Sequence, residues 1–382
     1  MTEMGSTAGN TPHLSGENTG IVYQTEFPSD HPEVGRPKTG VLLLNLGTPE
    51  GTDYWSMRRY LKEFLSDKRV IEANPVFWQL LLNTVILTTR PKASGEAYAS
   101  IWNSEKNESP LKTITRDQAD GVQRILHARY GEDIIVDWAM RYGYPRTEDA
   151  INDMMAKGCT RIVMVALYPQ YAAPTTATAY DHAFRALMKM RWQPAIRTAP
   201  SYHDNPQYID AVVNSIESHI AQLDWTPEVL LTSFHGLPKR YLLNGDPYHC
   251  QSAKTSRLIR DRLGWPKDTV KLCFQSRFGR EEWLKPYTDV MIEDLAKSGV
   301  KNMAIISPGF ASDCVETLEE LNMQGRETFM ENGGENFTFI PCLNASPDSV
   351  QLLADLATRE LQGWVEPAAD AATPAVYSAA AE

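Results

Sequence analysis

Lys157-Gly-Cys-Thr-Arg-Ile-Val-Met-Val165 runs into Leu167-Tyr-Pro-Gln-Tyr171, and Ser298-Gly-Val-Lys-Asn-Met-Ala-Ile-Ile306 runs into Ser307-Pro-Gly-Phe310. Each pair has the pattern of a glycine turn, an apolar strand, and a loop with proline and an aromatic residue that leads into a helix. Because this unit occurs twice, the chain is expected to fold into two similar α/β halves.

Outward from these stretches, short apolar runs alternate with longer helical patterns. The expected strands are Val41–Leu46, Ile134–Met140, Arg161–Leu167, Ala195–Thr198, Val229–Phe234, Val270–Phe274, Asn302–Ser307 and Phe337–Ile340. The expected helices include Asp117–Ala128, Thr147–Ala156, Pro206–Ala221, Cys250–Arg262, Pro286–Lys297, Cys314–Met330 and Pro347–Leu361. Near-continuous apolar strands that alternate with helices are typical of parallel sheets covered on both faces.

The expected fold class is therefore α/β, with two doubly wound, Rossmann-like domains that each hold a four-stranded parallel sheet. We place the first domain at residues 39–202 and the second at 203–364. Residues 1–38 and 365–382 are rich in small and polar residues, so we expect a disordered arm and a disordered tail. Ligands of such folds bind beyond the carboxyl ends of the strands, which predicts a site in the cleft between the domains.

The composition excludes several classes of protein. A net charge of −11 over 382 residues argues against a nucleic-acid partner, which would need a basic surface. The five cysteines have no C-x-x-C spacing, so neither a disulfide framework nor a structural zinc site is indicated. No Lys or Arg precedes Arg36, so we expect no secretory or mitochondrial leader and a cytoplasmic protein.

One apolar run, at residues 76–89, stands out from the rest of the chain. A bilayer-spanning helix takes about 20 apolar residues, so this run is too short, and Gln79 and Asn83 interrupt it. Two interpretations stay open. The run is a buried helix, or it is a hydrophobic lip that touches a membrane or covers an apolar ligand.

His235 is the first candidate for chemistry. It follows the apolar strand Val229–Phe234 and precedes Gly-Leu-Pro, which places it on a rigid element at the expected cleft. Neutral imidazole can bind a borderline metal or accept a proton near neutral pH. A single histidine at the end of a strand is more commonly a hydrogen-bonded structural residue than a metal ligand or a proton acceptor.

Three carboxylates form the second candidate group. Asp313, Glu316 and Glu320 are spaced i, i+3 and i+7, which predicts one face of a helix that starts near residue 313. Such a row could pass a hydrated cation or accept protons. Capping of the helix N-terminus explains Asp313 and Glu316 equally well, but it does not explain Glu320.

Basic and aromatic side chains follow other segments. Arg141 and Tyr142 come after the strand Ile134–Met140, where they could steer an anionic substrate and stack on a planar one, or simply form a turn. Arg90 and Lys92 follow the apolar run and could bind carboxylates, although such pairs are more often solvated surface. No phosphate loop or glycine-rich dinucleotide fingerprint occurs, so we expect no nucleotide.

Taken together and in this order, eight segments resemble those of the ferrochelatases, over nearly all of residues 40–362. They are Val41-Leu-Leu-Leu-Asn-Leu-Gly-Thr-Pro49, Glu108-Ser-Pro110, Met140-Arg-Tyr-Gly-Tyr-Pro145, Leu167-Tyr-Pro-Gln-Tyr171, Ser233-Phe-His-Gly-Leu-Pro238, Gly245-Asp-Pro-Tyr248, Gln275-Ser-Arg-Phe-Gly279 and Ser312-Asp-Cys-Val-Glu-Thr-Leu-Glu-Glu-Leu321. One segment alone has little meaning, whereas eight in register are highly specific.

This resemblance implies a metal-inserting lyase that places ferrous iron, its substrate, into protoporphyrin IX to form protohaem, the last step of haem biosynthesis. It implies that His235 is the essential histidine, that Glu316 is its partner across the cleft, and that Asp313 and Glu320 belong to an acidic path. His235 and Glu316 are both catalytic residues and metal ligands by this resemblance, and which of them delivers the metal and which accepts the protons stays open. By the same resemblance, the porphyrin pocket is lined by Asn45, Leu46, Arg90, Lys92, Ser109, Arg141, Tyr142 and Trp283. Residues of about 75–110 correspond to a mobile lip, which favours peripheral contact with the inner face of the membrane through residues 76–89.

The sequence departs from the family pattern at a few positions. Cys314 stands where some relatives have a histidine, Gln324 where some have an acid, and Gly236 where some have a small polar residue. Some relatives bind a [2Fe–2S] cluster on C-terminal cysteines, but no cysteine follows Cys342 here. We therefore expect no iron–sulfur cluster, and we favour a monomer.

Three alternatives remain open at this stage. The chain could be a chelatase for coproporphyrin, a chelatase that inserts cobalt or nickel, or a haem or metal carrier without turnover. A carrier needs an axial ligand but no acidic row, so the presence of both His235 and Glu316 favours the enzyme.

Overall fold

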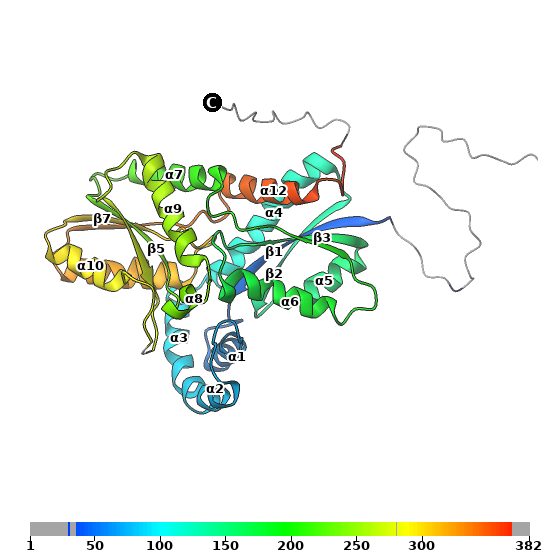
Figure 1. Cartoon of the computed structure of the whole chain (residues 1–382), viewed down its shortest axis with the longest axis horizontal. Helices are drawn as coiled ribbons and strands as arrows, with labels where there is room; N and C mark the ends of the chain where they lie inside the picture. Colours follow the sequence, from blue (N-terminus) through cyan, green and yellow to red (C-terminus); the bar gives the residue numbers. More distant parts are fainter. Residues whose placement is uncertain (1–29, 31–35, 280, 369–382) are drawn as a thin grey trace, which may run out of the picture. The chain divides into compact units, whose positions relative to one another are not determined.

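The repeated pattern of the sequence forms two sheets with the same topology. The first consists of β1 (Lys38–Gly47), β2 (Ile134–Tyr142), β3 (Cys159–Ala166) and β4 (Ala195–Thr198), in the order β2-β1-β3-β4. The second consists of β5 (Val229–His235), β6 (Val270–Gln275), β7 (Asn302–Ile306) and β8 (Asn336–Ile340), in the order β6-β5-β7-β8. All neighbouring strands are parallel, and β3 and β7 hold the same place in the two sheets (Figure 1). The predicted fold class is confirmed.

The structure is a computed structural model that describes residue 30, residues 36–279 and residues 281–368. Most of the arm and tail expected to be disordered, at 1–38 and 365–382, lies outside the described residues. The described residues from Pro37 onward form one compact unit that holds both sheets. The domain boundary at residues 202 and 203 stays a prediction.

Helices connect the strands at the positions that the periodicity predicts, with one exception. The stretch Cys314–Met330 is not one α-helix, because a π-helix, η3 (Glu316–Gln324), precedes α11 (Gly325–Glu331). Two further π-helices are η1 (Leu82–Ile86) and η2 (Ala173–Ala177). The α-helices are α1 (Tyr54–Leu65), α2 (Pro75–Leu81), α3 (Leu87–Ile101), α4 (Pro110–Tyr130), α5 (Thr147–Ala156), α6 (Thr178–Leu187), α7 (Pro206–Ile220), α8 (Lys239–Leu243), α9 (Tyr248–Leu263), α10 (Thr288–Lys297), α11 and α12 (Pro347–Leu361).

A single apolar core joins the two sheets. It contains Val41 of β1, Leu126 of α4, Leu230 of β5 and Leu353 of α12, each at most 1% exposed. The last helix, α12, packs against α4, α7 and β3, so the end of the chain returns to the first sheet (Figure 1). This shared core holds the carboxyl ends of both sets of strands in fixed positions, which is what a site built from both halves requires.

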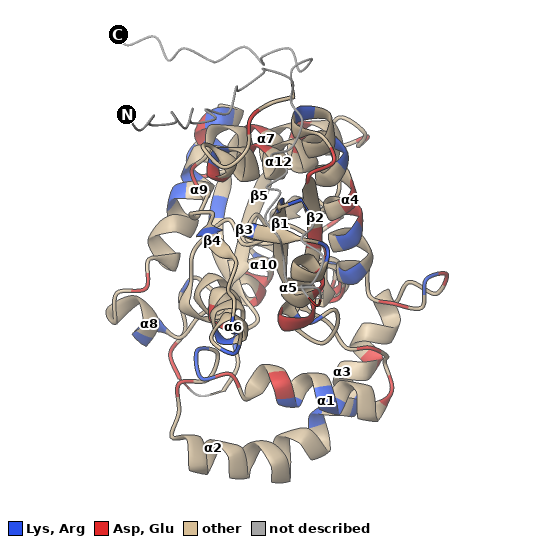
Figure 2. Ribbon diagram, turned by 90° about the vertical axis from the view of Figure 1, so that its right-hand side faces the viewer, with Lys and Arg blue, Asp and Glu red and all other residues tan. Residues whose placement is uncertain are grey.

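The apolar run at residues 76–89 forms α2, η1 and the start of α3, and it is not a buried helix. Val76, Phe77, Leu80 and Val85 are 50–80% exposed, whereas the neighbouring Leu82 is buried. Helix α2 carries no charged residue (Figure 2). Such a row of exposed apolar side chains is typical of a surface that meets an apolar ligand or phase. Within the described part of the chain, no helix is long and apolar enough to cross a membrane.

Candidate active site

A cavity of about 700 Å³ lies where the strand ends of the two sheets meet. Its walls come from the carboxyl ends of β1 and β2, from the loops after β3, β5, β6 and β7, from η3, and from Trp78 in α2. A cavity at the carboxyl ends of the strands is where a doubly wound fold places its ligand. Its volume falls in the range of sites for small organic molecules.

His235 ends β5 and lines this cavity. Its Nδ1 atom lies 2.6 Å from the carbonyl oxygen of Gly236. Because a carbonyl oxygen only accepts, the Nδ1 atom carries the proton of the neutral ring and Nε2 keeps its lone pair. The ring is thereby oriented with Nε2 as the nitrogen that can bind a metal or accept a proton.

Gly236 permits this geometry because the chain passes close to two neighbours. A Cβ atom at Gly236 would lie 2.7 Å from the carbonyl oxygen of Gln275 and 3.0 Å from the Trp283 ring. Trp283 itself lines the cavity, as the resemblance implies. A small polar side chain at residue 236 would therefore require Gln275 and Trp283 to move away from residue 236.

The acidic residues reach the cavity through the π-helix η3. Glu316, Glu320 and Gln324 all line the cavity, and so does Glu319. A π-helix closes i to i+5 hydrogen bonds and has more residues per turn than an α-helix, so residues four apart lie nearly in line. For this reason Gln324 extends the row of Glu316 and Glu320. Asp313 precedes η3, so it is not part of this row.

Asp313 is buried and does not line the cavity. Its carboxylate accepts hydrogen bonds from Asn344 Nδ2 at 2.6 Å, Thr317 Oγ1 at 2.9 Å and the backbone N–H of Cys342 at 3.2 Å. These bonds tie the start of η3 to the segment after β8. None of these donors is a backbone N–H of η3, whose N-cap Val315 makes no side-chain hydrogen bond, so Asp313 does not cap this helix.

Glu320 is held at the cavity wall by Ser276. Its carboxylate accepts bonds from the backbone N–H of Ser276 at 2.8 Å and from the hydroxyl at 2.5 Å. Burial raises the pKa of Glu320 above its ordinary value, against these bonds and the attraction of His235, while the charge of Glu316 adds to the rise. A carboxylate with a raised pKa accepts a proton more readily than an ordinary glutamate does.

The remaining expected residues fall into two groups. Asn45, Leu46, Arg90, Arg141 and Trp283 line the cavity. Ser109 instead caps α4 and borders a small neighbouring cavity, Lys92 is exposed away from the cavity wall, and the buried Tyr142 does not reach it. The sequence reasoning did not single out Tyr168, Glu319 or Arg240, which also line the cavity. Tyr168 could have been identified from the sequence, because it lies in the loop after a predicted strand, β3. No sequence pattern marks Arg240.

Comparison with known proteins identifies the family of this site. A family model described as ferrochelatase matches residues 38–361. The chain belongs to the ferrochelatase family. It is therefore an enzyme of haem biosynthesis, a lyase that inserts iron into protoporphyrin.

Proteins with similar sequences match this ferrochelatase-family chain over most of its length. The ferrochelatase of Allorhizobium ampelinum is 59% identical over 339 residues, which cover 89% of this chain and 98% of that protein. The ferrochelatase of Rhizobium meliloti is 56% identical, with 88% and 99% covered, and that of Rhodobacter capsulatus is 54% identical, with 89% and 97% covered. Among solved structures, SirB from Bacillus subtilis with Fe3+ matches with a TM-score of 0.49 and 11% identity, over 84% of this chain and 95% of that one.

Cys314 marks a departure inside the ferrochelatase site. It is 4% exposed and lines the cavity next to Glu316. Burial raises the pKa of this thiol well above its ordinary value, and the charge of Glu316 adds to the rise. A thiol in this state is neutral, so it is a weak metal ligand. No group of three or more His, Cys, Asp or Glu side chains among the described residues is arranged to hold a metal ion.

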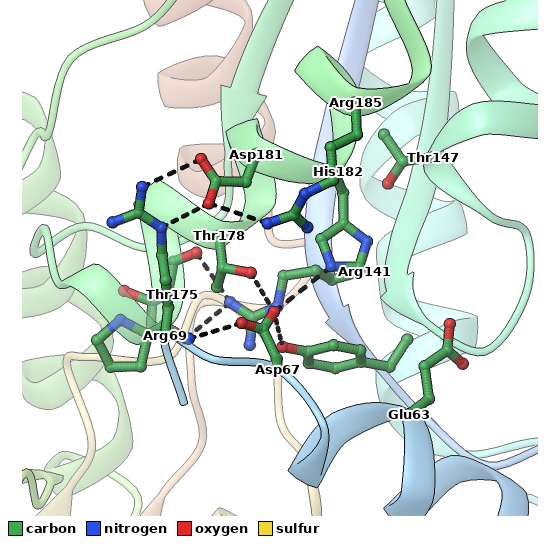
Figure 3. Close-up of polar contacts among 12 residues, drawn as sticks. Glu63, Asp67, Arg69, Arg141, Thr147, Thr175, Thr178, Asp181, His182 and Arg185 are labelled. Carbon is green, nitrogen blue, oxygen red and sulfur yellow. Dashed lines mark hydrogen bonds and ion pairs between the residues drawn. The ribbon is translucent and has the colours of Figure 1, made fainter. Parts of the chain in front are cut away.

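A network outside the cavity holds the loop between α1 and α2 of this ferrochelatase-family chain (Figure 3). Asp67, in the loop between α1 and α2, accepts a hydrogen bond from the Tyr142 hydroxyl at 2.8 Å and another from Thr178. His182 Nε2 lies 3.5 Å from the same carboxylate. Asp67 is 5% exposed, and its backbone oxygen accepts bonds from Val70 and Ile71, which line the cavity.

Arg141 connects this network to the cavity. Its Nη1 atom donates to the carbonyl oxygens of Pro174 and Thr175 in η2, at 2.8 Å each. Its guanidinium also lies 4.6 Å from the centre of the Tyr142 ring and 5.8 Å from that of Tyr168. Tyr142 therefore acts at the pocket indirectly, by holding Arg141 and Asp67.

Asp67→Asn should lower the free energy of unfolding and make it depend less on pH. Burial alone would raise the pKa of Asp67, but the bonds from His182, Thr178, Arg69 and Tyr142 hold it well below its ordinary value. The charged carboxylate thus contributes stability that is complete above about pH 5 and is lost as the pH falls below about 4. We expect the substitution to cost about 2 kcal/mol at pH 7.

Urea unfolding between pH 3 and pH 7 measures this effect. The wild type should lose more stability than Asp67→Asn as the pH falls through this window. Asp149→Asn, an exposed acid in the first turn of α5, is the matched control and should follow the wild type. Parallel curves for wild type and Asp67→Asn would contradict the role of the Asp67 charge.

Proposed function

We propose that His235 and Glu316 are the catalytic pair for insertion of ferrous iron into protoporphyrin IX, with Glu320 as the next acid of the path. The observation that carries this proposal is that all three side chains line one cavity at the strand ends of both sheets. The His235 Nε2 atom has a free lone pair, and Glu320 has a raised pKa. One imidazole and two carboxyl groups supply the nitrogen and oxygen atoms that ferrous iron accepts.

The chemistry places two demands on these side chains. Water must leave the iron, and two protons must leave the pyrrole nitrogens of the porphyrin. His235 and Glu316 can each bind the metal or accept a proton, and Glu320 can pass a proton onward along η3. A cavity that holds the porphyrin bent, with its nitrogens turned to one side, would favour the transition state over the flat ground state.

The porphyrin is proposed to lie between Leu46, Trp283 and the Arg141–Tyr168 stack, which combine apolar surface with a cation. The exposed apolar residues of α2 and η1 would form the lip through which it passes, and they support transient contact with a membrane. A monomer, a cytoplasmic location, the absence of an iron–sulfur cluster, and Ser109, Lys92 and Tyr142 as porphyrin contacts stay predictions.

Glu320→Gln and Asp313→Asn distinguish an acid of the path from an acid that holds the fold. Glu320→Gln should lower kcat by about tenfold or more with little change in Tm, because it removes a group that takes up protons in the cavity. Asp313→Asn should lower the stability by about 1–2 kcal/mol, because it weakens the bonds to Asn344 and Thr317. Its kcat per folded molecule should be nearly that of the wild type.

The assay is anaerobic insertion of Fe²⁺ into protoporphyrin IX, followed by the loss of porphyrin fluorescence, together with thermal unfolding. Turnover of protoporphyrin IX by the wild type supports the proposed reaction, whereas binding without turnover would favour a carrier. Parallel reactions with coproporphyrin III and with Co²⁺ or Ni²⁺ test the alternative chelatases. Loss of insertion in Asp313→Asn at unchanged Tm would return Asp313 to the acidic path.

A further inference from the structure

Arg240 bridges two segments at the wall of the cavity. It lies in α8, and its Nη1 atom is 2.6 Å from Glu72 Oε2. Its Nε atom is 2.6 Å from Glu281 Oε1. Glu72 belongs to the loop between α1 and α2, and Glu281 follows β6. All three side chains line the cavity, so two carboxylates share one guanidinium there.

These two ion pairs can exchange with solvent or with another anion. The side chains of Arg240, Glu72 and Glu281 are 35%, 38% and 45% exposed. Ion pairs with this exposure contribute little net stability, about 0–1 kcal/mol. The loop that carries Glu72 has a separate anchor in Asp67, whose buried carboxylate binds Tyr142 and Thr178. Glu72 can therefore leave Arg240 while this anchor of the loop stays in place.

The substrate brings anions of the same kind to this cavity. Protoporphyrin IX has two propionate groups, and each is a carboxylate like those of Glu72 and Glu281. Of the described arginines that line the cavity, Arg141 is bound to the carbonyl oxygens of η2 and Arg277 pairs with Asp289 at 2.9 Å. Two carboxylate receptors are then of interest: Arg90, which has no ion pair among the described residues, and Arg240, which already binds two carboxylates at the cavity wall.

Arg90 and Arg240 share one part of the wall. Arg90 has no ion pair among the described residues, and its guanidinium lies 5.0 Å from the centre of the Phe278 ring. Phe278 belongs to the same loop as Glu281, the partner of Arg240. Two arginines at this loop match the two carboxylates of the porphyrin in number and in charge.

We propose that Arg240 binds a propionate of the porphyrin, and that Glu72 and Glu281 bind its guanidinium before the porphyrin enters. This inference rests on the proposed function, because it requires that the porphyrin bind in this cavity. When the porphyrin enters, one glutamate is released from Arg240 and the propionate takes its position. Arg240 is then a residue that selects porphyrins with carboxylates.

The proposal predicts that the arginine and glutamate variants change the affinity for the porphyrin in opposite directions. Arg240→Ala removes the receptor and should weaken porphyrin binding, whereas Glu72→Gln and Glu281→Gln remove competitors and should strengthen it. A bridge that only holds the two segments together predicts the same sign for all three, because each substitution breaks the bridge. The direction of the change therefore separates a receptor from a structural link.

The experiment is a titration of protoporphyrin IX without metal, followed by quenching of tryptophan fluorescence. We expect Kd to rise about tenfold in Arg240→Ala and to fall about two- to threefold in Glu72→Gln and in Glu281→Gln. Arg240→Lys keeps the charge but loses the fork of donors, so its Kd should lie between wild type and Arg240→Ala. This variant also carries the test if Arg240→Ala does not fold.

Two controls make the result specific. Lys239 and Glu282 form an ion pair at 3.1 Å, adjoin Arg240 and Glu281 in sequence, and do not line the cavity. Lys239→Ala and Glu282→Gln should therefore leave Kd unchanged. Protoporphyrin dimethyl ester lacks the carboxylates, so its Kd should not respond to Arg240→Ala.

Two results would overturn the proposal for Arg240 while leaving the proposed function intact. One is a change of Kd in the same direction in the arginine and glutamate variants. The other is an equal change of Kd in Arg240→Ala for protoporphyrin IX and for its dimethyl ester. Failure of the wild type to bind protoporphyrin IX would overturn both. Since the titration contains no metal, its outcome is independent of the roles of His235 and Glu316.

Discussion

His235→Ala should reduce iron insertion at least about 10³-fold while leaving porphyrin binding nearly unchanged. The substitution removes the Nε2 lone pair of His235, which lines the cavity, and no other described histidine lines that cavity. The apolar walls and the arginines of the cavity remain, so the porphyrin should still bind. Anaerobic turnover of Fe²⁺ with protoporphyrin IX measures the first effect, and a titration without metal measures the second.

His219→Ala is the matched control for this experiment. His219 contacts Thr338 at 2.7 Å and does not line the cavity, so its loss should leave turnover close to that of the wild type. Turnover by His235→Ala comparable with that of the wild type would remove His235 from the reaction. An equal loss of porphyrin binding would instead make it a binding residue.

Glu316→Gln should lower kcat about 10²-fold or more and change KM for the porphyrin only slightly. Glutamine keeps the size of the side chain, so the porphyrin meets the same surface. The amide cannot take up a proton and binds ferrous iron more weakly than a carboxylate does. The effect should therefore fall on the step in which the metal enters and the pyrrole protons leave.

Glu319→Gln tests whether position matters as well as charge. Glu319 lines the same cavity, but its carboxylate accepts a bond from Gln324 Nε2 at 2.7 Å and it lies outside the row formed by Glu316 and Glu320. We expect a much smaller loss of kcat for this variant. Equal losses for Glu316→Gln and Glu319→Gln would mean that the total negative charge acts and that no single carboxylate is the partner of His235.

The sequence by itself determined the strands, most helices and the place of the histidine. Apolar runs of β-branched residues reappear as the eight strands, and the repeated unit at β3 and β7 reappears as the same position in two sheets. His235 could be placed because it follows such a strand directly. These features depend on neighbours in the chain, and periodicity along a sequence reports local structure.

The tertiary structure decided which polar residues meet. Gln275 donates to the backbone oxygen of Glu316 at 2.8 Å, where the π-helix begins, and Asp313 lies before this helix and outside the predicted row. Glu72 and Arg240 are 168 residues apart and still share one ion pair at the cavity. No local pattern marks such contacts, because packing of separate segments brings these side chains together.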